Sequence, residues 1–173
     1  MSDPAGGGID LDEFEQLLRR RAPELDANAD PDAISLVFLF ARLSAQMLAD
    51  LDARVHRPRG WSWSGFRIMQ AVLVCGPLEP RQVAPLAGVT RASISAVLNT
   101  LERDGLVERL RDSADRRLVT IELTEQGRKM VLDTLSDQHA VEREWASALS
   151  AGEQRTMIGL MRSLLASPRS DGE

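Results

Sequence analysis

One block of this sequence, residues 80–123, restricts the possible fold more than any other part of the chain. It contains two helical segments on either side of a glycine turn, and then two β-like runs on either side of a charged loop. In chain order these are Pro80–Ala87, Gly88-Val89, Arg91–Arg103, Leu106–Leu110, Arg111–Arg117 and Leu118–Leu123. Thr90 is a good N-cap for the second helix. The pattern predicts a helix-turn-helix followed by a two-stranded wing.

Long helices are predicted on both sides of this block. The segment from Pro31 to about His56 is apolar nearly all round, which indicates burial in its own domain or against a partner subunit. Polar residues within its most apolar run, such as Arg42 and Asp50, favour a buried helix over a membrane span. A second helix follows Thr124 and extends to about Leu149.

The last predicted helix starts at the capping box Ser150-Ala-Gly-Glu153. Its apolar residues form one stripe: Met157, Leu160, Met161, Leu164 and Leu165. Near the other end of the chain, Asp10–Arg20 has the spacing of a short amphipathic helix, which we expect Pro23 to stop. The predicted fold is therefore mainly α, with a small β-wing.

Composition narrows the setting in which the protein works. The chain has 173 residues, of which 43% are hydrophobic, and a single cysteine, which excludes an intramolecular disulfide and fits a reducing compartment. The acidic, Gly-rich start of the chain does not resemble a secretory signal, so we expect a cytoplasmic protein. The net charge is −5, but residues 80–129 hold nine basic and seven acidic side chains, so the middle of the chain is locally basic.

The second helix of the block has the two faces that a DNA-reading helix needs. Ile94, Val97, Leu98 and Leu101 share the face that can pack inward. The outward face carries the residues that we assign to DNA binding: Thr90, Arg91, Ser93, Ser95 and Asn99. Small hydroxyl and amide groups let a helix enter the major groove and hydrogen-bond to base edges and phosphates. An ordinary amphipathic surface helix explains the pattern equally well when this helix is taken alone.

The residues of the predicted wing tip favour DNA binding over an ordinary surface helix. Asp115 and Arg117 are two residues apart and can point to one side of the hairpin, where the carboxylate can hold the guanidinium in one orientation. A preset arginine enters the narrow, electronegative minor groove at a lower entropic cost, and Arg116 adds a second cation. The alternative is a solvated turn with a weak surface ion pair.

Three motifs in fixed order make the sequence similar to the multiple-antibiotic-resistance regulator (MarR) family. They are Gly105-Leu-Val-Glu-Arg109, Asp115-Arg-Arg117 and Leu123-Thr-Glu-Gln-Gly-Arg128. The resemblance covers roughly residues 30–167. It implies a homodimer that binds a double-stranded DNA operator and is released from it by a small molecule, with Arg117 as the minor-groove arginine and Asp115 as its partner. The implied division is a helical dimerisation base (30–60 and 124–167) and a DNA-binding lobe (61–123), with an extension (1–29) and a tail (168–173).

The sequence departs from the family pattern in two places. Before the DNA-proximal helices the family usually has Leu-Thr-x-x-Gln, whereas this chain has Trp61-Ser-Trp-Ser-Gly65. The N-terminal extension resembles that of urate-responsive members, but their tryptophan in the extension is missing and Asn99 stands in place of an aspartate. Urate is therefore not expected as the ligand.

An aromatic cluster with one cation marks a candidate effector site. Trp63 and Arg67 are four residues apart on one helical face, and with Phe38 they suit a small aromatic anion such as a phenolic carboxylate. Core packing at the start of a helix is the alternative, and it is the preferred interpretation for Trp61.

Other chemistry has less support. Cys75 is a candidate redox sensor, but no basic neighbour lowers its pKa, and a buried structural thiol is the simpler interpretation. The only histidines, His56 and His139, lack a metal-ligand pattern, and no catalytic motif is present, so we expect neither a metal, a cofactor nor an enzyme. A winged helix that binds another protein remains a rival, which salt dependence distinguishes because DNA binding weakens steeply as ions rise.

Overall fold

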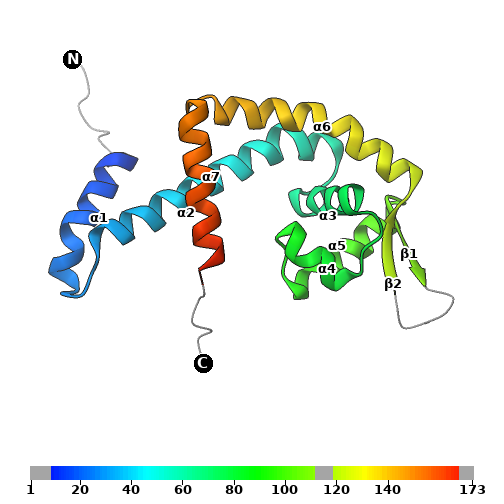
Figure 1. Cartoon of the computed structure of the whole chain (residues 1–173), viewed down its shortest axis with the longest axis horizontal. Coiled ribbons are helices and arrows are strands. Elements are labelled where there is room, and N and C mark those ends of the chain that lie inside the picture. The colour runs from blue at the N-terminus through cyan, green and yellow to red at the C-terminus, as the bar shows by residue number, and fades with distance from the viewer. Residues whose placement is uncertain (1–8, 112–118, 168–173) are drawn as a thin grey trace, which may run out of the picture. The chain divides into compact units, whose positions relative to one another are not determined.

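The computed structural model describes residues 9–111 and 119–167, which form seven α-helices and one two-stranded antiparallel sheet (Figure 1). The chain divides into two compact units, residues 1–50 and 51–173. The predicted class, mainly helical with a small β-wing, is confirmed. The finer division into extension, base, lobe and tail stays a prediction.

The first unit contains helix α1 (Leu11–Leu25) and most of helix α2 (Pro31–Leu51). The Asp10 carboxylate accepts a hydrogen bond from the Glu13 N–H at 2.8 Å and so caps α1. The rings of Phe14 and Phe38 lie 5.5 Å apart and join the two helices. The expectation that Pro23 stops α1 was wrong: only two residues of the helix follow it, so little of the helical ladder depends on the hydrogen bond that a proline deletes.

Between α2 and the lobe, the helical winding of the backbone first widens and then narrows. A π-helical turn, η1 (Asp52–His56), leads into a 3-10 turn, η2 (Arg57–Arg59), and Gly60 ends it with a φ of 77°. Ion pairs join this connector to helix α6 (Glu125–Ala146): Arg54 to Glu144 at 2.7 Å, and Arg59 to Asp137. The helical segment predicted to reach His56 therefore has the expected extent, but its last turn is not α-helical.

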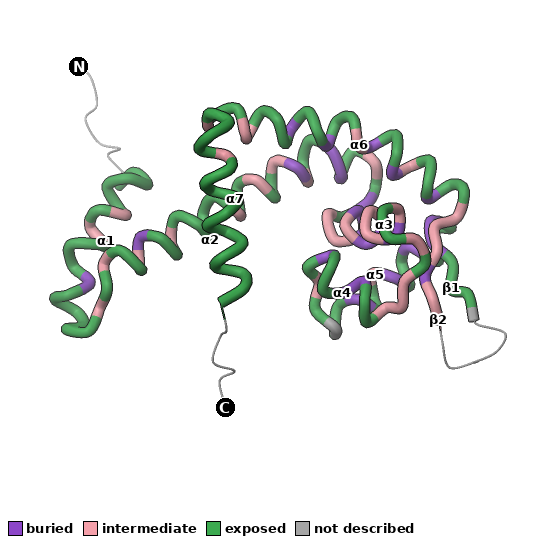
Figure 2. The backbone as a smooth tube through the Cα atoms, viewed as in Figure 1, coloured by how far each residue is buried: buried purple, intermediate pink, exposed green. Residues whose placement is uncertain are grey.

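The lobe is built from helices α3 (Trp63–Cys75), α4 (Pro80–Ala87) and α5 (Arg91–Arg103) and strands β1 (Val107–Arg111) and β2 (Val119–Leu123). Ser62 begins α3 by accepting a hydrogen bond from the Gly65 N–H at 3.1 Å. The strands pair with Arg109 opposite Ile121, and Leu78 adds a bridge to the same Ile121. Buried residues concentrate in this part of the chain (Figure 2). Its fully buried side chains include Phe66, Ile68, Met69, Val83, Leu98 and Ile121.

Helix α6 is anchored to the base of the wing by its first turn. The Thr124 hydroxyl donates to the Gly105 carbonyl at 2.7 Å and accepts from the Gly127 N–H at 3.0 Å, while the Thr124 N–H donates to the Leu106 carbonyl at 3.2 Å. A Cβ at Gly127 would lie only 1.9 Å from the Leu106 carbonyl oxygen. Only glycine therefore lets α6 approach the strand this closely.

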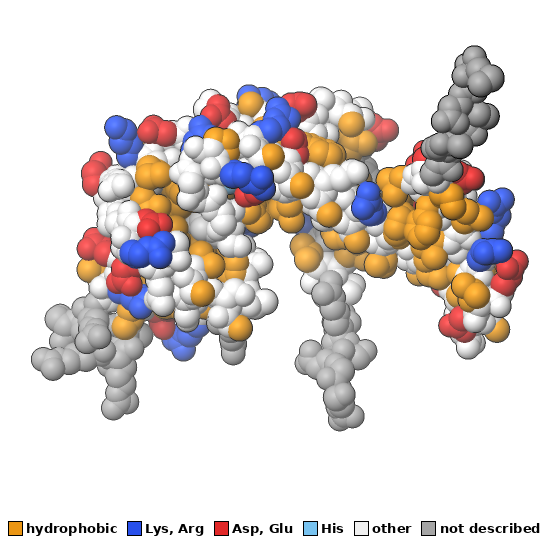
Figure 3. Space-filling view, turned by 180° about the vertical axis from the view of Figure 1, so that it is seen from behind, with side chains coloured by type: hydrophobic (Ala, Val, Ile, Leu, Met, Phe, Trp, Pro, Cys, Tyr) orange, Lys and Arg blue, Asp and Glu red, His pale blue; other side chains and the backbone are white. Residues whose placement is uncertain are grey.

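The predicted capping box begins the last helix, α7 (Ala151–Ala166), and no residue of α7 is buried. Its stripe is exposed, with Leu160 at 62% and Leu165 at 80%. Helix α2 likewise exposes large hydrophobic side chains, namely Leu36, Val37, Leu39, Phe40, Leu43 and Leu48. Hydrophobic side chains (orange) gather over the first unit, on the right of Figure 3. By length and composition alone, one described stretch, Pro31–Arg59, is apolar enough to cross a membrane, with a mean hydropathy of 1.5.

Candidate nucleic-acid interface

Helix α5 presents a polar start and a polar outer face. The Ser93 N–H donates to Thr90 Oγ1 at 3.1 Å, and the two hydroxyl oxygens lie 2.8 Å apart, so Thr90 is the N-cap that the sequence predicted. The hydroxyl pair lies at the N-terminal end of the helix, where the helix dipole and N–H groups favour an anion such as a phosphate.

The two faces of α5 are divided as predicted. Ile94, Leu98 and Leu101 are buried, and Val97 packs against the same core while remaining partly exposed. The side chains of Ser93, Ser95 and Asn99 are exposed, so their hydroxyl and amide groups are available to a ligand as large as duplex DNA. The remaining candidates, the side chain of Arg91 and the tip residues Asp115, Arg116 and Arg117, lie outside the described residues.

Arg109 on strand β1 was not among the predicted site residues, yet it orients one of them. Its Nη2 donates to Asn99 Oδ1 at 2.5 Å, and its Nε lies 3.5 Å from Glu102 Oε2. The guanidinium thereby links the wing to α5 and holds the Asn99 amide in one orientation. The two-residue period of a strand places Arg109 on the same face as the buried Val107, which was the signal in the sequence that pointed toward α5.

A groove of about 620 Å³ lies between α5 and the wing. Its lining residues are Pro80, Ser95, Leu98, Asn99, Glu102, Arg109 and Val119. The exposed polar side chains of Ser95 and Asn99 border this groove together with the Arg109 guanidinium. The arrangement has the three parts expected of a winged helix: a capped helix, a polar outer face and a strand that leads to the wing tip.

The residues proposed for the effector site include one close pair. The Arg67 guanidinium lies 5.6 Å from the centroid of the Trp63 ring and also donates to Gln70 Oε1 and the Leu86 carbonyl, both at 3.2 Å. The predicted shared face is therefore present, but the cation already has three partners within the lobe. Phe38 belongs to the first unit, where it contacts Phe14.

The sequence of the lobe agrees with its geometry. A profile of the MarR family matches residues 61–119, which run from the start of the lobe into strand β2. The lobe is therefore a MarR-family domain. Members of this family are DNA-binding transcriptional regulators, and the chain is therefore a transcriptional regulator of the MarR type.

Individual relatives agree with this assignment. An uncharacterised helix-turn-helix transcriptional regulator of Bacillus subtilis, YwaE, is 29% identical over 133 residues, covering 77% of this chain and 78% of YwaE. The transcriptional repressor YetL of the same organism is 31% identical, covering 61% of this chain and 64% of YetL. A structure of BpsR from Bordetella bronchiseptica, whose DNA binding is regulated by 6-hydroxynicotinic acid, shares the fold with a TM-score of 0.70 at 20% identity, covering 75% of this chain and 92% of BpsR.

This MarR-type regulator also buries a histidine where the connector meets the lobe. His56 is fully buried, with its ring 4.7 Å from Phe66 and 5.4 Å from Trp63. Among the described residues, neither ring nitrogen has a hydrogen bond of normal geometry. Burial lowers the pKa of His56 below its ordinary value, and the nearby Asp52 carboxylate offsets only part of that effect. His56 is therefore a neutral, structural ring near neutral pH.

The sequence interpretation of Cys75 as a buried thiol was wrong. Cys75 ends α3 and is exposed, because the helix stops there and Gly76 turns the chain away. His139 is exposed on α6, and no group of three potential metal ligands occurs in the part of the chain that the structure describes.

Proposed function

We propose that this regulator is a homodimeric repressor, which binds a pseudo-palindromic operator and is released from it by a small aromatic anion. The observation that carries the proposal is the exposed polar face of α5, beside a wing that Arg109 links to it. The cytoplasm is the expected location. The repressor role follows the relative YetL, and release by an aromatic acid follows the regulation of BpsR by 6-hydroxynicotinic acid.

In this proposal α5 reads the major groove. Ser95 and Asn99 face the base edges, and the Thr90 and Ser93 hydroxyls with Arg91 meet the phosphate backbone near the helix start. Asp115 orients Arg117 into the adjacent minor groove, where Arg116 adds a phosphate contact. The contacts of Ser95 and Asn99 with base edges supply sequence specificity. The wing adds affinity and fixes the position of the protein along the DNA.

A second copy of the chain is the proposed cover for the exposed apolar surfaces. Both the α7 stripe and the outer face of α2 expose side chains of leucine size, with Val37 at 67% and Leu160 at 62%. Surfaces of this kind mark interaction sites, and obligate homodimer interfaces bury more than about 2,000 Å² and are apolar. A two-fold dimer then places two copies of α5 on one side of the DNA.

The proposed anion site is the pair Trp63 and Arg67, and the role of Phe38 stays a prediction from the sequence. An aromatic carboxylate would stack on Trp63 and would have to draw the guanidinium away from the Leu86 carbonyl or Gln70. In the proposed dimer, the ligand binds one spacing of the two DNA-binding lobes more tightly than another. The ratio of these two ligand affinities sets the largest possible effect on DNA binding.

The test starts by selecting an operator from a random duplex pool and measuring its affinity by fluorescence anisotropy over a salt series. We expect affinity to fall steeply with salt, and an insertion of about five base pairs between the half-sites to reduce it toward the nonspecific level. Asn99→Ala should weaken the operator by about 1–3 kcal/mol, whereas Gln16→Ala, at an exposed helical site in α1, should leave it unchanged. Salt-independent binding, or tolerance of the insertion, would contradict the proposal.

A further inference from the structure

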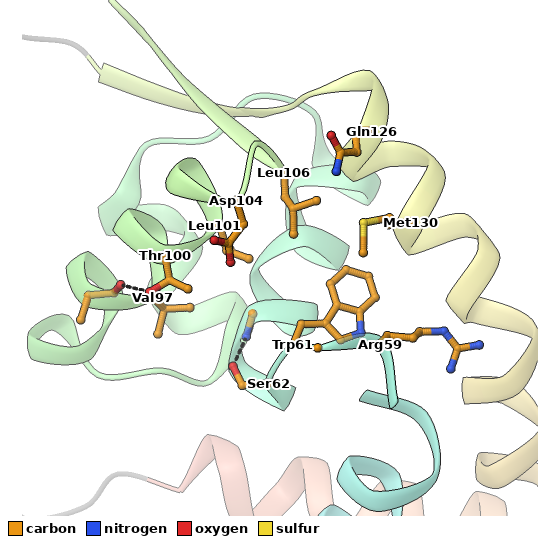
Figure 4. A pocket seen from close by; sticks show the side chains of 13 residues that line it. Arg59, Trp61, Ser62, Val97, Thr100, Leu101, Asp104, Leu106, Gln126 and Met130 are labelled. Carbon is orange, nitrogen blue, oxygen red and sulfur yellow. Dashed lines mark hydrogen bonds between the residues drawn. The ribbon is translucent and has the colours of Figure 1, made fainter. Parts of the chain in front are cut away.

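Helix α5 offers different polar groups on its two flanks. On the flank away from the wing, the Thr100 hydroxyl donates to the Ala96 carbonyl of its own helix at 3.2 Å, beside a hollow of about 500 Å³ (Figure 4). On the flank toward the wing, the Asn99 amide borders the groove of about 620 Å³, and its partner Arg109 comes from strand β1 instead. This contact with another element fixes the direction in which the amide faces, and the direction limits the bases that Asn99 can recognise.

The two ends of the Asn99 amide have opposite hydrogen-bonding character, and Arg109 selects between them. The oxygen Oδ1 accepts and the nitrogen Nδ2 donates, whereas a guanidinium has donors and no acceptor. Asn99 must therefore turn Oδ1 toward Arg109, 2.5 Å from Nη2, and its NH₂ group is left to face another partner. The Glu102 carboxylate, one turn further along α5 and 3.5 Å from Arg109 Nε, restrains the guanidinium from a second direction.

Asn99 and Arg109 together present hydrogen-bond donors to the groove. Both residues line it and both are exposed. Within the described residues the guanidinium contacts Asn99 through Nη2 and Glu102 through Nε, so Nη1 keeps N–H groups for a further acceptor. A base edge that approaches this pair therefore meets the Asn99 NH₂ group next to the N–H groups of a cation.

The bases differ in what they present to such a pair in the major groove. Guanine carries two neighbouring acceptors, N7 and O6, whereas adenine carries one acceptor, N7, beside the N6 amino donor. Thymine offers a single acceptor beside a methyl group, and cytosine offers a donor. Asparagine commonly contacts adenine with both ends of its amide, which requires Oδ1 to accept from the N6 amino group. Here Oδ1 is held by Arg109, and the adenine amino group would point its hydrogens at the guanidinium.

We infer that Asn99 and Arg109 act as one donor-only unit that selects guanine in the operator. Asn99 Nδ2 donates to one of the acceptors N7 and O6, and the guanidinium donates to the other while it remains bonded to Asn99 Oδ1. Arg109 is thereby a specificity-determining residue on the wing as well as a support for α5. The inference rests on the proposed function, in which α5 enters the major groove, and goes beyond it by naming the base and the residue that decides it.

The experiment uses the full chain and operator duplexes that differ in one base pair. This base pair is the one at which Asn99→Ala reduces discrimination most, found by substituting each position of the selected operator in turn. In anisotropy titrations the parent protein should bind the guanine duplex at least about tenfold more tightly than the adenine duplex. Arg109→Met, which keeps an unbranched side chain and removes its donors, should lower this preference to less than about threefold or reverse it, because the amide can then use both ends on adenine.

Arg103→Met is the matched control for the loss of charge. Arg103 is exposed at the end of α5, where its Nε lies 3.1 Å from Asp104 Oδ1, and its recorded contact does not involve Asn99. Its replacement removes one positive charge from the same lobe. We expect a similar weakening of the guanine and adenine duplexes, with the preference for guanine unchanged.

Modified bases test the inference on the parent protein, without any substitution in the chain. Hypoxanthine keeps N7 and O6 and lacks the guanine amino group that lies in the minor groove, so it should bind within about twofold of guanine. The analogue 7-deazaguanine lacks N7 and should bind at least about fivefold more weakly. A parent preference for adenine, an unchanged guanine preference in Arg109→Met, or equal binding of 7-deazaguanine would overturn the inference. Failure of the proposed function is distinguishable, because the random pool would then yield no duplex bound above the nonspecific level.

Discussion

Replacing Gly127 with alanine tests how tightly helix α6 is joined to the wing. The new methyl would sit 1.9 Å from the Leu106 carbonyl oxygen and 2.8 Å from its carbonyl carbon, both backbone atoms that cannot rotate away. The first turn of α6 must withdraw by about 1 Å, an overpacking strain of about 1–3 kcal/mol. Withdrawal also weakens the hydrogen bonds from Thr124 to the Gly105 and Leu106 carbonyls, at about 1 kcal/mol each.

The helix itself gains from the same substitution, because alanine is better than glycine in a helix by about 1 kcal/mol. The expected net loss in the free energy of unfolding is about 2–4 kcal/mol, or a fall of about 1–2 M in the urea midpoint. Urea unfolding is followed by circular dichroism at one protein concentration, because the stability of a homodimer, the proposed state, depends on concentration. Gly152→Ala, where a Cβ meets only the Ser150 hydroxyl at 4.0 Å, is the control and should raise stability by up to about 1 kcal/mol, the helix-propensity gain alone. A Gly127→Ala midpoint equal to that of the parent would refute the reasoning.

Three further predictions concern the DNA interface and the buried histidine. Arg109→Ala removes the hydrogen bond that orients the Asn99 amide and should weaken operator binding by about 1–2 kcal/mol in anisotropy titrations. Most of the loss should depend on the base that Asn99 contacts in the proposal. An equal loss on all DNA sequences would assign Arg109 to the phosphates instead. Arg117→Ala should weaken the operator by about 1–3 kcal/mol without changing the circular dichroism spectrum, and unaltered affinity would remove the wing tip from the interface. Burial lowers the pKa of His56, so below a pH of about 6.5 the unfolded chain binds a proton that the folded chain does not bind, and stability should fall as the pH is lowered. The fall should be smaller in His56→Phe. Parallel pH profiles of the two proteins would contradict this prediction.

Much of the lobe was predictable because its signals are local. Helices α4 and α5 begin and end where the sequence indicated, since a proline, a threonine cap and glycines at turns act over a few residues. The less local features were missed. Pro23 lies inside α1, and the end of the long apolar helix is a π-helical turn, because both depend on neighbours that periodicity does not register. Cys75 was predicted buried from its apolar neighbours in sequence, but the helix ends with its side chain facing outward.

The division of α5 into a buried face and an exposed polar face was also predictable, because residue type and helical period determine it together. The partners of those residues were not, since Arg109 approaches Asn99 only when strand β1 folds back beside α5. The same limit applies to the aromatic cluster. The sequence placed Trp63 and Arg67 on one face and assigned Trp61 to core packing, but the hydrogen-bonding state of an indole nitrogen depends on which acceptors the tertiary fold brings near it.

The two flanks of helix α5 make different contacts. On the flank toward the wing, Arg109 bridges Asn99 and Glu102, so the helix is held by a charged hydrogen bond and a weaker ion pair. On the opposite flank, Val97 and Thr100 border a hollow of about 500 Å³ rather than packed side chains. The charged contacts therefore hold α5 beside the wing, and Ile94, Leu98 and Leu101 hold its inner face on the core. Because the contacts toward the wing are polar and those toward the core are apolar, substitutions at Arg109 should alter the orientation of Asn99 while leaving the packing of α5 intact.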